Sequence, residues 1–256
     1  MNFCKYFALS FVMISCLLTY TNSEYRIIGG TDWNIEDSAY LVSIYYNIDD
    51  YICVGSLVTR EKVVTSANCV AFLDVDFLVV AAGVTDLRHI RDWTQFRPVI
   101  GVRHPRDYNP NTKYMDIAVM TLRGPFGKSP TIKTIQYCGC TFEERTTMRV
   151  SGWGWTTEEN GMRSDTLKST ELDSLPYNVC ENYARMAGRT FTRSMICAAH
   201  DGADVCVGDS GAPGVVDGKM CAVVSHNQGC LNRDYPTVFT VINDDIIAFL
   251  DEEIHC

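Results

Sequence analysis

The stretch Gly208-Asp209-Ser210-Gly211-Ala212-Pro213 decides how the rest of this sequence is interpreted. It places a serine between an aspartate and a glycine, with a further glycine ahead of the aspartate. A second stretch, Asp116-Ile117-Ala118-Val119, adds a carboxylate. A serine becomes a strong nucleophile only when a base within hydrogen-bond reach takes its proton. Three more motifs precede or separate these two: Arg26-Ile27-Ile28-Gly29-Gly30, Thr65-Ser66-Ala67-Asn68-Cys69 and Ser151-Gly152-Trp153-Gly154.

Short apolar or alternating stretches recur between turn residues along the chain, and their β-branched and aromatic content predicts strands. Helical periodicity is convincing only after Asn243, which can cap a C-terminal helix, and a shorter helix is predicted near Val179–Met186. The pattern predicts an all-β barrel or sandwich protein, with Gly124–Pro130 connecting two halves. The predicted strands are Tyr40–Tyr46, Lys62–Ala67, Phe77–Ala82, Phe96–Val102, Asp116–Leu122, Met148–Gly152, Met220–Ser225 and Val238–Ile242.

The first 23 residues have the features of a secretory signal peptide. Lys5 precedes an apolar run from Phe7 to Leu18, and Thr21 and Ser23 are small residues of the kind found at a signal cleavage site. The alternative is a membrane anchor, but the run is shorter than the ~20 residues that span a bilayer core. We therefore expect a soluble, secreted, extracellular protein.

The cysteines predict a disulfide framework. Cys4 and Cys16 leave with the signal, so ten of the twelve remain, an even number in an exported chain. Cys138-Gly139-Cys140 has no second cluster of cysteine or histidine nearby, so neither a metal nor another cofactor is expected.

The charge of the chain argues against nucleic acid as a partner. Removal of residues 1–26 takes away Lys5, Arg26 and Glu24, which leaves 20 of the 22 basic and 30 of the 31 acidic residues. An acidic surface of this kind repels phosphate backbones. The expected partners are extracellular proteins, and the oligomeric state is left open.

All five motifs occur in one order, and on them the mature region resembles the chymotrypsin-like (trypsin-type) serine protease family over essentially its whole length. The resemblance implies two packed six-stranded antiparallel β-barrels with the active site between them. It also implies a propeptide at 24–26 and a protease-like domain over 27–256, with its halves joined near 124–136. Within the family, the chain is similar to gut proteases and group 3 allergens of mites, and to inactivated paralogues from parasitic mites.

The resemblance also assigns roles to the motifs. Cleavage after Arg26 would free Ile27, whose new ammonium group would pair with Asp209, as in a zymogen. The backbone N–H groups of Gly208 and Ser210 would form the oxyanion hole. The implied disulfides are Cys53–Cys69, Cys180–Cys197 and Cys206–Cys230. The remaining four cysteines, Cys138, Cys140, Cys221 and Cys256, have three possible pairings, which the sequence leaves open.

Asn68 stands where the family has its catalytic histidine. An amide has no nitrogen that titrates near neutral pH, so it cannot shuttle a proton, and Asp116 and Ser210 would then be remnants. The sequence therefore predicts a pseudoprotease that is not an enzyme. It would bind proteins as a decoy, competitor or inhibitor in an extracellular proteolytic cascade, such as host complement if the source is a parasite. The alternative is a weakly active serine endopeptidase that uses His226 or a histidine of its substrate.

The specificity pocket gives a mixed signal. By resemblance, Asp204 is the carboxylate that attracts arginine or lysine, and Ser225 and His226 line the cleft, His226 in place of a tryptophan. Asn227 and Thr237 replace two glycines that keep the pocket open, so the sequence predicts a crowded pocket. Two smaller departures, Val54 and Ala212, replace glycines near the nucleophile.

Overall fold

The computed structural model of the chain describes residues 30–89, 94–139, 144–155, 163–200, 205–206, 208–226 and 235–255. Several predictions fall outside these residues. They concern the signal peptide 1–23, the propeptide 24–26, the Arg26–Ile27 cleavage site, and Cys140, Asp204, Asn227, Cys230 and Cys256. No helix in the described part is long and apolar enough to cross a membrane.

The first barrel closes in the strand order β2-β3-β4-β7-β6-β5, and all its pairings are antiparallel. Its interior is made by branched aliphatic side chains such as Val42, Ile44 and Val80, which are at most 1% exposed. These residues fit a pleated surface that is buried on one face. The strands are β2 (Leu41–Tyr46), β3 (Asp50–Leu57), β4 (Lys62–Thr65), β5 (Leu78–Ala82), β6 (Gln95–Arg103) and β7 (Ala118–Leu122).

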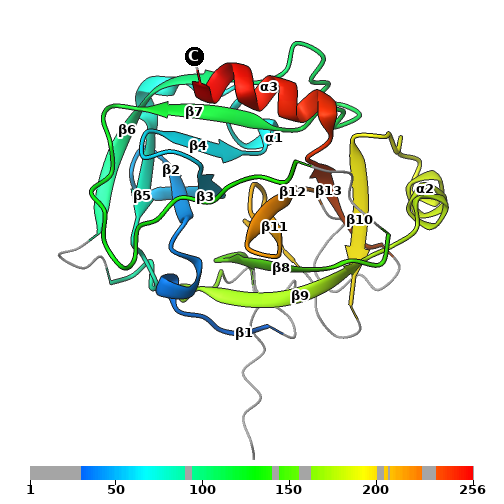
Figure 1. The fold of residues 1–256 in the computed structure, drawn as a ribbon, viewed down its shortest axis with the longest axis horizontal. Coiled ribbons are helices and arrows are strands. Elements are labelled where there is room, and N and C mark those ends of the chain that lie inside the picture. Colours follow the sequence, from blue (N-terminus) through cyan, green and yellow to red (C-terminus); the bar gives the residue numbers. More distant parts are fainter. Residues whose placement is uncertain are drawn as a thin grey trace, which may run out of the picture.

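The second barrel follows the order β9-β10-β13-β12-β11-β8 and closes because β8 also pairs with β9. The short strand β1 (Thr31–Asp32) adds to the edge of β9. Figure 1 shows the two barrels side by side. The predicted pair of six-stranded antiparallel barrels is confirmed. The strands are β8 (Thr147–Gly152), β9 (Lys168–Ser174), β10 (Met195–Ala199), β11 (Pro213–Val216), β12 (Lys219–His226) and β13 (Thr237–Val241).

Three α-helices lie within the described ranges, and both predicted helices are confirmed: α2 (Tyr177–Met186) and the C-terminal α3 (Asp244–His255). The Asn243 side chain accepts a hydrogen bond from the backbone N–H of Ile246 at 3.0 Å, which caps α3. Ile246 and Leu250 pack in one cluster with residues of both barrels, so α3 lies over the junction of the two (Figure 1). The third helix, α1 (Ala67–Val70), is a single turn after β4, and two 3₁₀ turns cover Ile35–Ser38 and Val75–Phe77.

All eight predicted strands are present, with ends that differ by one or two residues. The prediction missed β1, β3, β9, β10 and β11. Strand β9 (Lys168–Ser174) shows why: its sequence is mostly polar, and Lys168 is 1% exposed because Asp32, on the neighbouring β1, pairs with it. A partner from a distant segment makes such a residue suitable for a barrel, and no local pattern reveals that partner.

Candidate active site

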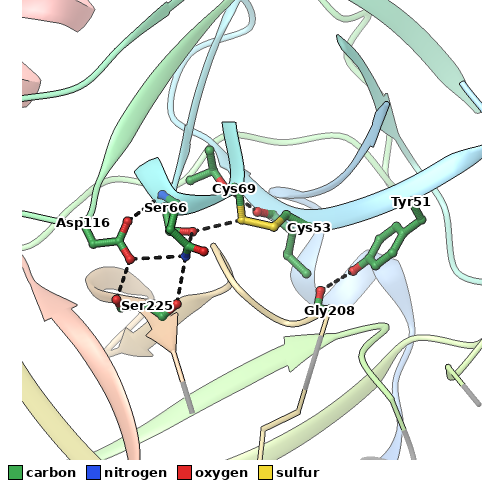
Figure 2. Close-up of a disulfide and its surroundings, with 10 residues drawn as sticks. Tyr51, Cys53, Ser66, Cys69, Asp116, Gly208 and Ser225 are labelled. Atoms are coloured by element: carbon green, nitrogen blue, oxygen red, sulfur yellow. Dashed lines mark hydrogen bonds between the residues drawn. A yellow bond between two sulfur atoms is a disulfide. The ribbon is translucent and has the colours of Figure 1, made fainter. Parts of the chain in front are cut away.

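Asn68 lies on α1, directly after β4, and is held by four hydrogen bonds. Its backbone N–H donates to Asp116 Oδ1 at 2.7 Å. Its side-chain Nδ2 donates to Asp116 Oδ2 at 3.3 Å, to Ser66 Oγ at 3.1 Å and to the Ser225 carbonyl at 3.0 Å. Figure 2 shows Asp116, Ser66 and Ser225 gathered at this point. Asn68 is therefore fixed against the Asp116 carboxylate.

Asp116 is fully buried just before β7, and its carboxylate is surrounded by donors. Ser225 Oγ donates to Oδ2 at 2.5 Å, in addition to the two bonds from Asn68. Burial raises the pKa of Asp116, and the hydrogen bonds from Ser225 and Asn68 partly oppose that rise. The carboxylate keeps the position from which it would orient a ring, although the group it orients here is an amide.

Ser210 sits on a sharp turn that two glycines make possible. Gly208 and Gly211 have φ values of 98° and 84°, a region that side chains rarely adopt. A Cβ at Gly211 would also overlap the Val54 carbonyl. The carbonyl of Ser210 accepts a hydrogen bond from the N–H of Val54 at 3.0 Å, which ties the turn to β3. Within the described residues, the Ser210 hydroxyl has no hydrogen-bond partner.

Asp209, next to Ser210, is fully buried. Its carboxylate accepts hydrogen bonds from the N–H groups of Gly154 at 2.8 Å and Cys206 at 3.1 Å. A Cβ at Gly152 or at Gly154 would overlap this carboxylate, so both positions require glycine. Pairing of Asp209 with a freed Ile27 remains a prediction, because Ile27 is not described.

The oxyanion hole assigned to Gly208 and Ser210 is open in this structure. In the described part of the chain, neither backbone N–H has an acceptor. The carbonyl of Gly208 accepts a hydrogen bond from the Tyr51 hydroxyl at 2.8 Å (Figure 2). This bond fixes the orientation of the peptide unit between Gly208 and the residue that follows it.

Tyr51 is the functional residue that sequence reasoning missed, and no motif pointed to it. Burial, followed by the charge of Asp209, raises the pKa of Tyr51 well above its usual value, so the hydroxyl remains a donor. The guanidinium of Arg163 lies 4.7 Å from the centre of the Tyr51 ring and holds it in place.

His226, the candidate surrogate base, is linked to the same carboxylate through Ser225. Its Nδ1 lies 3.1 Å from Ser225 Oγ, the hydroxyl that donates to Asp116. Its ring lines a pocket of ≈ 410 Å³ beside α2 (Tyr177–Met186) and β10. Burial, followed by the charges of Arg189 and Lys113, lowers the pKa of His226 to about 4. An imidazole with this pKa is a weak base at neutral pH.

The structure describes only part of the predicted specificity pocket. Thr237 is completely buried at the start of β13, and Ser225 is 1% exposed at the end of β12. Asp204 and Asn227 are not described, so the predicted crowding of the pocket stays a prediction. Val54 and Ala212 are both fully buried in one core cluster that contains residues of both barrels.

Three disulfides are present among the described residues. Cys53–Cys69 joins β3 to α1, and Cys180–Cys197 joins α2 to β10, as the resemblance implied. Cys138–Cys221 is one of the pairings that the sequence left open. Cys206 is also disulfide-bonded, but its predicted partner, Cys230, is not described. The first bridge ties the strand that holds the Ser210 turn to the helix that carries Asn68 (Figure 2).

Comparison with known proteins identifies the family. A family model described as trypsin matches residues 27–247. The chain belongs to the trypsin family. Among its curated relatives, trypsin beta of Drosophila erecta is 31% identical over 222 residues, which is 86% of this chain and 85% of that protein. Trypsin alpha of the same species is 32% identical over 84% of this chain and 82% of that protein. A trypsin of Phaedon cochleariae is 29% identical over 87% and 86%. The finer likeness to mite proteins stays a prediction.

These relatives correct one expectation. We expected from Asn68 that the chain would be a pseudoprotease and not an enzyme, whereas the relatives are named trypsins. That expectation is therefore wrong. The physical reason is that the base is one contribution among several. In a serine protease without a working triad, roughly 10³–10⁴ of the acceleration over water survives through the oxyanion hole and substrate binding.

Proposed function

We propose that this chain is a secreted serine endopeptidase of low intrinsic activity, in which a histidine of the substrate supplies the base that Asn68 lacks. The observation that carries the proposal is the state of Ser210. Its turn, its free backbone N–H groups and the buried Asp116 are all in place, yet its hydroxyl has no hydrogen-bond partner in the described part of the chain.

The geometry favours a substrate histidine over His226. The ring of His226 lines the pocket beside α2 (Tyr177–Met186), and its pKa of about 4 makes it a poor proton acceptor near neutral pH. An imidazole from outside keeps an ordinary pKa of roughly 6.5, which suits general-base catalysis at physiological pH. Asn68 is also shorter than the histidine that the family has at this position.

The proposed reaction uses only groups of this chain and the substrate. The substrate imidazole takes the proton of the Ser210 hydroxyl while Oγ attacks the scissile carbonyl, and the oxyanion lies toward the N–H groups of Gly208 and Ser210. The protonated imidazole then returns the proton to the leaving amine as the peptide bond breaks. Water releases the acyl group in the second half of the reaction.

The disulfides support an extracellular location, because such bonds persist in oxidising compartments. A second role is favoured by the buried Thr237 together with Asn68: slow turnover of bound proteins would let the chain act as a competitor in an extracellular proteolytic cascade. In that case the partners are other proteases or their substrates.

The test compares two peptides that differ only in a histidine or an alanine beside the scissile bond. The mature chain, cleaved after Arg26, should hydrolyse the histidine peptide roughly 10²-fold faster, since general-base catalysis contributes 10²–10⁴-fold. The Ser210→Ala variant should lose both activities. Equal rates on the two peptides, or unchanged hydrolysis by Ser210→Ala, would exclude the proposal.

A further inference from the structure

A groove separate from the active site opens where the turn between β3 and β4 meets the connection that leaves β7. Its volume is ≈ 1020 Å³, and Asn68, Asp116 and Ser210 do not line it. Backbone hydrogen bonds of 2.9 Å hold the connection against the turn, from Phe126 N to the Arg60 carbonyl and from Ile135 N to the Leu57 carbonyl. The walls of this groove, which we call the basic groove, are therefore fixed before any ligand arrives.

Three cations line the basic groove: Arg60, Lys128 and Lys133, each with an exposed side chain. No aspartate or glutamate is among the lining residues. None of the three cations has an ion-pair partner within the described part of the chain. Glu61 follows Arg60 in the turn but does not line the groove. The groove thus presents unneutralised positive charge.

This charge stands against an acidic background. The whole chain carries a net charge of −9, but the segment from Ile117 to Thr141 contains no aspartate or glutamate. The separation of charge produces a local positive field on a protein that otherwise repels anions. An acidic partner would therefore be directed to this face rather than to the rest of the surface.

The other lining residues indicate what kind of anion fits. Four apolar residues line the groove: Val58 is partly exposed, and Leu57, Phe126 and Ile132 lie beneath the surface at no more than 3% exposure. Threonine and serine residues also line it. The guanidinium of Arg97 lies 5.2 Å from the centre of the Phe126 ring. A sulfated sugar is polar over its whole surface and would leave the apolar part unused. A peptide can present carboxylates and an apolar side chain together.

We propose that the basic groove binds an acidic segment of a partner protein, with an apolar or aromatic side chain between its carboxylates. It would act as a docking site remote from Ser210 and hold a protein substrate or an inhibitor on the surface. The proposal does not depend on the chemistry at Ser210, because binding at the groove is measured without any cleavage.

The test uses the full mature chain and a fluorescent peptide with three glutamates on each side of one phenylalanine. Fluorescence anisotropy at low salt should show saturable binding that weakens at high salt, where surface charges are screened. The double variant Lys128→Glu/Lys133→Glu should weaken binding by more than about tenfold, because like charges then face each other. The control Arg193→Glu/Lys219→Glu makes the same change in net charge at exposed residues outside the groove and should bind within about twofold of the parent chain.

Other results would overturn the proposal. Equal weakening by both double variants would mean that the peptide follows net charge rather than the groove. Binding that survives replacement of phenylalanine by glycine at full strength would remove the apolar component. Heparin binding that depends on Lys128 and Lys133, with no peptide binding, would identify a glycan site. Self-association lost in the same variant would identify a second copy of this chain as the occupant.

Discussion

The nucleophile turn of the second barrel and the base position of the first barrel meet at one site but differ in what they retain. The turn keeps its positive-φ glycines, its buried Asp209 and its unoccupied N–H groups. The base position keeps Asp116 and the hydrogen bonds around it, but Asn68 presents an amide there. The comparison shows that the geometry of a site and its proton chemistry are separable: an amide can donate hydrogen bonds to the Asp116 carboxylate without being able to take the proton of Ser210.

The largest effect is expected from restoring the base. Asn68→His should raise kcat by roughly 10³-fold or more on peptides without histidine, since loss of the base in a comparable protease costs on the order of 10⁶. It should also remove the advantage of histidine-containing substrates. Steady-state kinetics on the paired peptides measures both. The control Asn68→Ala should give no gain, and a similar gain in that control would show that the amide merely blocks the site.

The second effect concerns His226 and the dependence of the protein's stability on pH. Burial depresses the pKa of His226 from 6.5 to about 4, so its contribution to stability is complete above pH 6.5 and is lost as the pH falls toward 4. The parent chain should therefore lose up to about 3 kcal/mol of unfolding free energy over this range that His226→Phe does not lose. Urea unfolding at pH 7.5 and pH 4 measures the difference. His104→Phe, which changes an exposed ring, should behave like the parent.

The third effect tests the specificity pocket. In the Asn68→His background, arginyl peptides should still be cut poorly, because Thr237, which is buried, is predicted to occupy space that a long side chain needs. Adding Thr237→Gly should raise kcat/KM on arginyl peptides by about tenfold relative to alanyl peptides, on the scale of a few removed heavy atoms in a pocket. Efficient arginyl cleavage by Asn68→His alone would show that Asn227 and Thr237 do not crowd the pocket.

The smallest effect measures what the Ser210 turn contributes to catalysis once a base has been restored at position 68. In the Asn68→His background, Tyr51→Phe removes the hydrogen bond to the Gly208 carbonyl, a bond worth about 1 kcal/mol. We expect kcat to fall about fivefold with KM unchanged, because the lost bond fixes the turn on which the N–H groups of Gly208 and Ser210 lie and touches no substrate. Tyr45→Phe removes a hydroxyl from the neighbouring ring, 5.9 Å away, and should leave kcat unchanged. A change confined to KM would place Tyr51 in substrate binding instead.

The sequence predicted the pair of barrels, which the structure confirms, and it nominated the candidate site residues. Apolar alternation located the strands that need no ion-pair partner from a distant segment to be buried. The ordered motifs pointed to Asn68, Asp116 and Ser210. The strand β9 was missed because Lys168 becomes a core residue only once Asp32 lies beside it. Tyr51 was missed because its role depends on a carbonyl 157 residues away along the chain. Contacts between distant segments are what local patterns cannot supply.

Gly152 and Gly154 have a consequence for how this protein can change over time. Neither position can accept even a methyl group without displacing the Asp209 carboxylate, whereas position 68 tolerates a different functional group with its hydrogen bonds intact. Mutational freedom is therefore greatest where the proton chemistry resides and smallest in the packing behind it. A lineage built on this scaffold can exchange one reactivity for another more easily than it can alter the frame that holds the serine.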